Sequence, residues 1–546
     1  MNTICNLLDI DVYLLNFLKI KYIVRLTNVS KNQYYLLHNI DFIEKIYLIK
    51  YRNISLIINY AAEYGYMSVI QYIDLSVNKF KYINLDSVTD VSILEWFRRK
   101  ADSGYKFKYT CGLVDNACIG GNIEILEWLK LSDYKFKYSP SAINNASESG
   151  NIEILNWFAN SSYKFKYTTK AIDNACKNNH ICVLQWFANS PYEFRYSINA
   201  IDNACKNNHI SVLDWFAKSS YKFKYSYDAI YYACENNHIS VLDWFANSIY
   251  EFKYNSIAII NACSNGHVSI LEWFANSTCK FKYNHRAINE ASIYGYIDIL
   301  KWFSTSNYEF KYNHEAIDYA AGNGQIEILE WFSNSNYEFE YSHEAINDAA
   351  SNGHIDILKW FSESNYEFKY TTDAIDYAAA NGYDNILEWF RWSPYEFKYT
   401  KNAINKAAGS DHIHILEWFK KSPYAFKYSQ KAINLASENR YTSVLDWFRN
   451  SIYEFKYDNT TIELAAENGC LNVIQWYKKY YNYKYDNTVM NAAAIRGHLY
   501  LLKWLLNNDK NLEKYIGETI YQAALYKQIH ILKWFGKHGN NFLDTA

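Results

Sequence analysis

The chain has 546 residues, of which 50% are hydrophobic and 21% are charged, so it can bury a large apolar surface and is not compositionally disordered. Its formal net charge is -2, which excludes a global positive field that would favour nucleic acid or an anionic membrane. Charged residues interrupt the apolar runs that follow Met1, so we expect neither a signal peptide nor a membrane span.

Residues 1–50 do not follow the pattern of the rest of the chain, and we expect them to be helical. The stretches LLDIDVYLLNFL and YIVRLTNVSKNQYYLL resemble an F-box, a three-helix motif that docks onto Skp1 in SCF-type ubiquitin ligases. Asp9 stands where the family has proline, and the late tryptophan of the family is missing. The resemblance implies that the Skp1 contacts are Leu8, Val12, Leu14, Ile23, Leu26 and Val29. The alternative is that this segment only caps the first repeat of a solenoid.

Tryptophan recurs at intervals of 29 residues from Trp128 to Trp476, and Trp96, Trp504 and Trp534 extend the series with slightly different steps. Self-similarity at a fixed period of this length indicates a stacked repeat array. We predict an all-α solenoid of about 17 two-helix units of 29 residues, with short extended arms between them. The array is expected over residues 51–475, and divergent repeats with a cap over 476–546.

One unit, residues 197–225, reads SINAIDNACKNNHISVLDWFAKSSYKFKY. Ser197 is placed to cap a first helix, and Asn208 to close it in the left-handed conformation that Gly150 and Gly353 supply in other copies. The apolar residues around Trp215 predict a second, buried helix with tryptophan in the core. The segment YKFKY alternates rings and charges, which predicts an extended arm with its rings inward and its charges in water.

This unit resembles an ankyrin repeat, a two-helix module of about 33 residues. Ala200 and Ile201 stand for the family's Pro-Leu, Asp202 for its His, and Asn208 with His209 for its Gly-His. The resemblance covers roughly residues 54–540. The shorter period implies that the projecting hairpin of ankyrin repeats is reduced to an arm. Aromatic-rich, A+T-biased arrays of this kind are similar to ankyrin proteins that giant DNA viruses of amoebae encode.

The resemblance implies a protein-binding function on the concave face that the first helices and arms form. At first-helix positions where the side chain varies while the frame repeats, the candidate partner-binding residues are Asn203, Lys206, Tyr232, Glu235, Asn261, Ser264, Glu290, Ile293, Tyr319, Asp348, Tyr377 and Lys406. With an F-box, the array would recruit substrates to a ubiquitin ligase; without one, it would be a scaffold. We expect a monomer without enzymatic activity or cofactor, because repetition argues against a unique catalytic constellation.

Nucleic acid is the alternative partner. The arms place a row of cations among aromatic residues, an arrangement that could bind a single strand. The neighbouring arm position changes from lysine in early repeats to glutamate in later ones, for example Glu309 and Glu367. Mixed signs of this kind favour a solvated, salt-bridged surface. The row of cations comprises Lys108, Lys137, Lys166, Arg195, Lys224, Lys253, Lys282 and Lys311.

Histidine and cysteine each recur at one repeat position, as in His180 and His209 or Cys176 and Cys205. Equivalent positions of neighbouring repeats are expected about 10 Å apart, since packed helices lie 8–10 Å apart. Two such histidines cannot share a metal ion, and two such cysteines cannot form a disulfide. We therefore expect no metal site, turn histidines that bond to the backbone, and a reducing intracellular location in the cytoplasm, that of the host if the source is viral.

Overall fold

The computed structural model describes residues 62–63, 67, 70, 83–101 and 107–538 and confirms an all-α array of paired helices. A lone second helix, α8, precedes fifteen consecutive pairs from α9/α10 to α37/α38. Among the described residues, no helix has the length and apolar character that crossing a membrane requires. The array divides into two compact units, with one boundary after Ala258 and residues Asn276–Cys279 grouped with the first.

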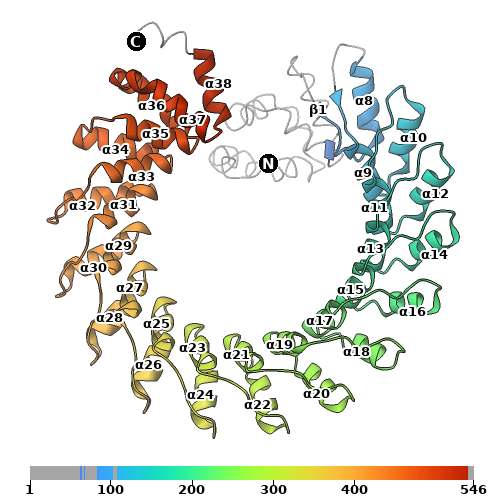
Figure 1. The fold of residues 1–546 in the computed structure, drawn as a ribbon, viewed down its shortest axis with the longest axis horizontal. Coiled ribbons are helices and arrows are strands. Elements are labelled where there is room, and N and C mark those ends of the chain that lie inside the picture. The colour runs from blue at the N-terminus through green and yellow to red at the C-terminus, as the bar shows by residue number, and fades with distance from the viewer. Residues whose placement is uncertain (1–61, 64–66, 68–69, 71–82, 102–106, 539–546) are drawn as a thin grey trace, which may run out of the picture. The chain divides into compact units, whose positions relative to one another are not determined.

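The first unit contains two helix layers (Figure 1). Its first helices are α9 (Gly112–Ile119), α11 (Ser141–Glu148), α13 (Lys170–Lys177), α15 (Asn199–Lys206) and α17 (Asp228–Glu235). Its second helices are α8 (Val91–Ala101), α10 (Ile123–Leu131), α12 (Ile152–Asn160), α14 (Ile181–Asn189), α16 (Ile210–Lys218) and α18 (Ile239–Ala246). Consecutive first helices pack on one another more extensively than consecutive second helices do. The unit therefore curves with its first helices on the concave side.

The second unit repeats this arrangement, and helix α19 (Ser256–Ser264) contains the boundary. The first helices are α21 (Arg286–Ile293), α23 (Glu315–Gly322), α25 (Glu344–Ser351), α27 (Thr372–Ala380), α29 (Lys401–Gly409), α31 (Gln430–Glu438), α33 (Asn459–Glu467), α35 (Asn487–Ile495) and α37 (Ile516–Leu525). The second helices are α20 (Val268–Asn276), α22 (Ile297–Thr305), α24 (Ile326–Asn334), α26 (Ile355–Glu363), α28 (Asp384–Trp392), α30 (Ile413–Lys421), α32 (Thr442–Asn450), α34 (Leu471–Tyr481), α36 (Leu499–Asn508) and α38 (Ile529–His538), with a 3-10 helix, η1 (Lys510–Tyr515), after α36.

The predicted helix boundaries are confirmed. Ser197 Oγ accepts a hydrogen bond from the backbone N–H of Asn199 (3.1 Å), so it caps the first turn of α15. Asn208 closes that helix at φ 59°, and Gly353 closes α25 at φ 81°. At position 353, glycine avoids a steric clash as well as backbone strain. A Cβ on Gly353 would lie 2.7 Å from the Tyr383 ring of the next repeat.

The core lies between the two helix layers and contains the alanine, isoleucine, leucine and phenylalanine of each unit. Phe216, which follows Trp215, has no exposed surface, and its equivalents are among the largest fully buried side chains. The expected tryptophan core is therefore wrong for most repeats: Trp215 and its equivalents are half-buried, and Trp476, at 5% exposed, is the exception. The tryptophan side chain lies at the edge of the buried face of the helix, whereas the phenylalanine that follows it points into the core.

The arms have the predicted pattern of half-buried rings and exposed charges, as in Phe136 and Lys137. In the described part of the chain, strand pairing occurs only between β1 (Ile83–Asn84) and β2 (Phe107–Lys108), which are parallel. The later arms are linked by side chains instead. Tyr225 Oη donates a hydrogen bond to the carbonyl of Glu251 in the next arm (2.5 Å), and Tyr312 donates in the same way to Glu338 (2.6 Å).

Candidate functional site

The first helices expose one stripe of side chains on the concave side of each unit. In α15 the stripe contains Asn199, Asn203 and Lys206, whereas Ala200, Ile201, Ala204 and Cys205 are buried. The spacing of the exposed positions is that of one helix face. The candidate partner-binding residues all lie on such stripes, four in the first unit and eight in the second.

In the first unit the structure brings Lys206 and Tyr232 together from successive repeats. The Lys206 ammonium lies 4.4 Å from the centre of the Tyr232 ring, a distance typical of a cation–π contact. Asn203 and Glu235 are half-buried on the same stripe. These four residues form a polar surface with one partly exposed ring.

In the second unit the most exposed candidates are Tyr319 and Tyr377, each at 41%. The Lys406 ammonium lies 3.8 Å from the centre of the Tyr377 ring, and Glu290 pairs with Arg286 at 3.2 Å. Burial, together with Glu344 and Asp318, raises the pKa of Asp348 above its usual value. The remaining candidates, Asn261, Ser264 and Ile293, are half-buried. Tyr319 and Tyr377 therefore offer the largest exposed apolar surface among these candidates.

The sequence interpretation missed a hydrogen-bonded link between successive repeats, which we call the inter-repeat clasp. Asp202, at 3% exposed, accepts hydrogen bonds from the backbone N–H (3.0 Å) and Oγ–H (2.6 Å) of Ser226, the cap of the next first helix. Eight further clasps join Asp86 to Thr110, Asp115 to Ser139, Asn144 to Thr168, Asp173 to Ser197, Asp318 to Ser342, Asn347 to Thr371, Asp376 to Thr400 and Asn405 to Ser429. The recurrence of Asp or Asn 24 residues before most of the caps was the available signal.

Burial changes the pKa of the aspartates in four of the clasps. It raises the pKa of Asp173, Asp202, Asp318 and Asp376 although hydrogen bonds from the caps act in the opposite direction. Tyr231 and Ile260 replace the carboxylate or amide in two successive repeats, and the boundary between the units, after Ala258, lies close to Ile260 in the sequence. The clasp residues hold the array together and are not available to a partner.

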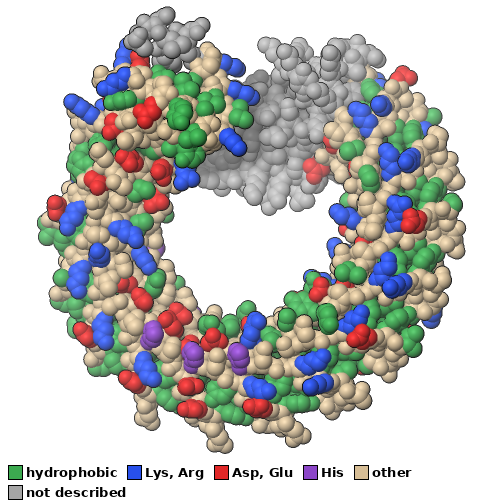
Figure 2. All heavy atoms as spheres, in the orientation of Figure 1, with side chains coloured by type: hydrophobic (Ala, Val, Ile, Leu, Met, Phe, Trp, Pro, Cys, Tyr) green, Lys and Arg blue, Asp and Glu red, His purple; other side chains and the backbone are tan. Residues whose placement is uncertain are grey.

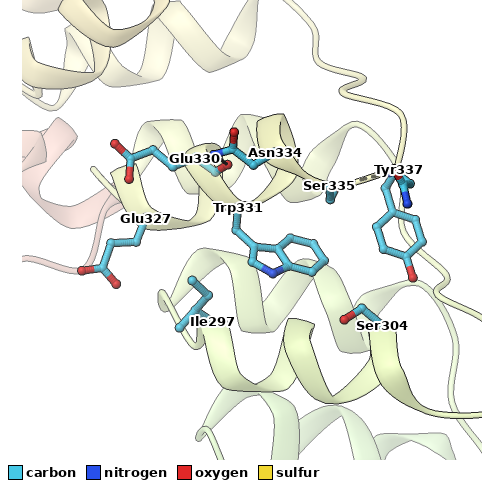
Figure 3. Close-up of a pocket in the computed structure, with 9 residues that line it drawn as sticks. Ile297, Ser304, Glu327, Glu330, Trp331, Asn334, Ser335 and Tyr337 are labelled. Atoms are coloured by element: carbon cyan, nitrogen blue, oxygen red, sulfur yellow. Dashed lines mark hydrogen bonds between the residues drawn. The ribbon is translucent and has the colours of Figure 1, made fainter.

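A groove beside the tryptophan recurs on the second-helix layer. Cavities of about 550, 830 and 530 Å³ lie at Trp244, Trp331 and Trp389. At Trp331 the indole from α24 faces Ile297 and Ser304 of α22, with Glu327 and Glu330 toward one end and Tyr337 at the other (Figure 3). The grooves were not predicted, because they follow from the half-exposed position of the tryptophan.

The arms offer less to nucleic acid than their sequence suggests. Phe136 stacks on Tyr163 of the next arm with ring centres 4.1 Å apart, and the Lys166 ammonium lies 4.8 Å from the centre of the Tyr138 ring. Glu309 pairs with Lys311 at 3.2 Å. Figure 2 shows charges of both signs mixed along the described surface in that view. A base could stack on these rings only by displacing contacts that the protein makes with itself.

Four of the recurrent histidines, His180, His209, His238 and His498, bond to the backbone, as predicted. His180 Nε2–H donates to the carbonyl of Glu148 and His209 Nε2–H to that of Lys177, each at 3.0 Å across the turn between repeats. Burial raises the pKa of the Cys176 and Cys205 thiols well above the usual value. Within the described ranges, no three His, Cys, Asp or Glu side chains converge in a way that could hold a metal ion.

The six residues assigned to Skp1 binding, Leu8 to Val29, lie outside the described residues. The choice between an F-box and a cap therefore stays a prediction, as do the expected bounds of the N-terminal and C-terminal regions. No protein-family model matches the chain, and the comparison with curated proteins finds no match. The candidate site thus rests on the geometry of the repeat alone.

Proposed function

We propose that the chain is a protein-binding scaffold whose partners contact the first-helix stripes. The observation that carries the proposal is the contrast within each first helix. Buried positions such as Ala200 and Ile201 keep the same residue types from repeat to repeat, whereas the exposed stripe carries Asn203, Tyr232, Tyr319 or Tyr377. Partly exposed tyrosines on a rigid frame are typical of residues that dominate protein interfaces.

The finer proposal is a substrate-recruiting adaptor of an SCF-type ubiquitin ligase. The ankyrin-like unit supports target binding, and the F-box-like segment around Leu26 supports delivery to Skp1. Buried, reduced thiols such as Cys205 agree with a reducing intracellular environment.

The partner surface can be tested by removing two tyrosine rings. The double variant Tyr319→Ala, Tyr377→Ala should bind the partner on the order of tenfold to a hundredfold more weakly, since loss of an interface anchor costs about 1–3 kcal/mol. The full chain with each variant would be used for affinity purification from the cells that produce it, followed by titration of the recovered protein. Tyr319→Phe, Tyr377→Phe keeps both rings and should retain binding. Equal affinity of all three chains would contradict the proposal.

The adaptor role can be tested separately with Skp1. In the full chain, Leu26→Asp with Val29→Asp should abolish co-purification with Skp1, because charges would replace two apolar contacts that the F-box resemblance implies. Binding of the target should not change in this variant. If the unaltered chain does not retain Skp1, the segment is a cap and the scaffold proposal stands without the ligase role.

A further inference from the structure

In two repeats, a lysine of the protein itself covers the groove beside the tryptophan. The Lys420 ammonium lies 5.8 Å from the centre of the Trp447 ring and 3.3 Å from the Glu417 carboxylate, which also accepts a hydrogen bond from Trp447 Nε1–H (2.6 Å). Lys130 occupies the same place, 5.7 Å from the Trp157 ring centre and 3.4 Å from Glu127. An indole face and a carboxylate together form a place for one cation.

The Trp244 repeat has the same carboxylate and indole without the lysine. Asp214, the equivalent of Glu417, accepts a hydrogen bond from Trp244 Nε1–H (2.7 Å). Ala217 stands in the place of Lys420, and its single methyl group cannot fill the space. The result is the cavity of about 550 Å³, lined also by Asp243 and by Ile249, which is 96% exposed.

We propose that the groove of Trp244 binds a lysine or arginine side chain of a partner protein, in the place that Lys130 and Lys420 take in their own repeats. The cation would lie over the indole face near Asp214, and Asp243 adds negative charge on the other side. Ile249 offers apolar contact to the residue beside the cation. The inference goes beyond the proposed function, because it adds a second contact surface on the second helices.

The Trp389 groove provides an internal comparison within the same molecule. Lys359 stands there in the place of Asp214, and Ser362 in the place of Ala217. The Glu388 carboxylate already accepts hydrogen bonds from Trp392 Nε1–H (2.6 Å) and Trp418 Nε1–H (2.8 Å). A cation entering this groove would meet Lys359, so we expect it to bind much more weakly than at Trp244.

The test uses the full chain labelled with 5-fluorotryptophan, with the Trp244 and Trp389 fluorine resonances assigned from Trp244→Phe and Trp389→Phe. The probes are the tripeptides acetyl-Gly-Arg-Gly-amide and acetyl-Gly-Gln-Gly-amide. The arginine peptide should shift the Trp244 resonance saturably, with half-saturation on the order of 100 mM as expected for one exposed cation–π contact and one exposed ion pair. It should shift Trp389 much less, and the glutamine peptide should shift neither.

The decisive variant is Ala217→Lys, which should fill the groove with the protein's own cation and abolish the response of Trp244 to the arginine peptide. Ala217→Gln is the matched control of similar length without charge and should retain the response. The proposal is overturned if the arginine peptide leaves Trp244 unshifted, if the glutamine peptide shifts it equally, or if Ala217→Lys responds like the unaltered chain. Because the probes are peptides, none of these outcomes depends on a partner of the first-helix stripes.

Discussion

Phe216→Ala should make the amides of α15 and α16 exchange with solvent on the order of a hundredfold to a thousandfold faster, since truncating a buried phenylalanine costs about 3–5 kcal/mol. Phe216 has no exposed surface, and its ring lies 5.1 Å from that of Tyr196 and 6.1 Å from that of Phe194. The substitution therefore opens a cavity between the helices and the preceding arm. Hydrogen exchange is the appropriate measurement, because long repeat arrays need not unfold in one step.

Trp215→Ala is the matched control in the neighbouring position. The Trp215 side chain is half-buried, so its removal should cost about 1–2 kcal/mol, less than removal of the phenylalanine. Repeats distant in the sequence, such as α34 and α36, should exchange at the same rate in all three chains, because each repeat contacts only its neighbours. A larger effect for Trp215→Ala than for Phe216→Ala would mean that the tryptophan row, and not the phenylalanine row, forms the core.

The sequence was sufficient for features that depend on residues close together in the chain. Ser197 and Asn208 identify the two ends of one helix because a cap and a left-handed residue act within a single turn. The left-handed position also recurs at Arg440 and Lys527, neither of which is a typical residue for that conformation. There the stacking of the array imposes the backbone, which local preference would not predict.

Features that depend on contacts between repeats were misjudged or missed. The sequence shows that Trp215 and Phe216 are both apolar, and Phe194 of the preceding arm contacts both rings, but only the packing between the helix layers buries Phe216 fully while Trp215 stays half-buried. The clasp between Asp202 and Ser226 spans 24 residues and two repeats. Tyr319 and Tyr377 are exposed on one face of their helices, as helical spacing predicts.

Asp318→Ala should destabilise its repeat by about 2–4 kcal/mol, because it leaves the half-buried N–H and Oγ–H of Ser342 without their acceptor. In the intact clasp Asp318, at 4% exposed, accepts from these groups at 2.8 and 2.7 Å. Asp318→Asn should lose less than about 1 kcal/mol at pH 7 or gain stability, because it removes a buried charge. Asn347 shows that an amide fits: it accepts from Thr371 N–H and donates to Thr371 Oγ1, each at 3.0 Å.

The stability difference between Asp318→Asn and the unaltered chain should depend on pH, and this dependence would identify the buried charge of Asp318 as its cause. Burial raises the pKa of Asp318 in the folded chain, so the folded state takes up a proton more readily than the unfolded state, whose carboxyl has a pKa of about 3.9. The cost of the charge is therefore complete above the folded pKa and is relieved as the pH falls through it. Hydrogen exchange of α23 and α25 at pH 7 and near the unfolded pKa should show the advantage of Asp318→Asn only at the higher pH. If Asp318→Asn were as damaging as Asp318→Ala at pH 7, the carboxylate itself, and not only its two acceptor bonds, would be what holds successive repeats together.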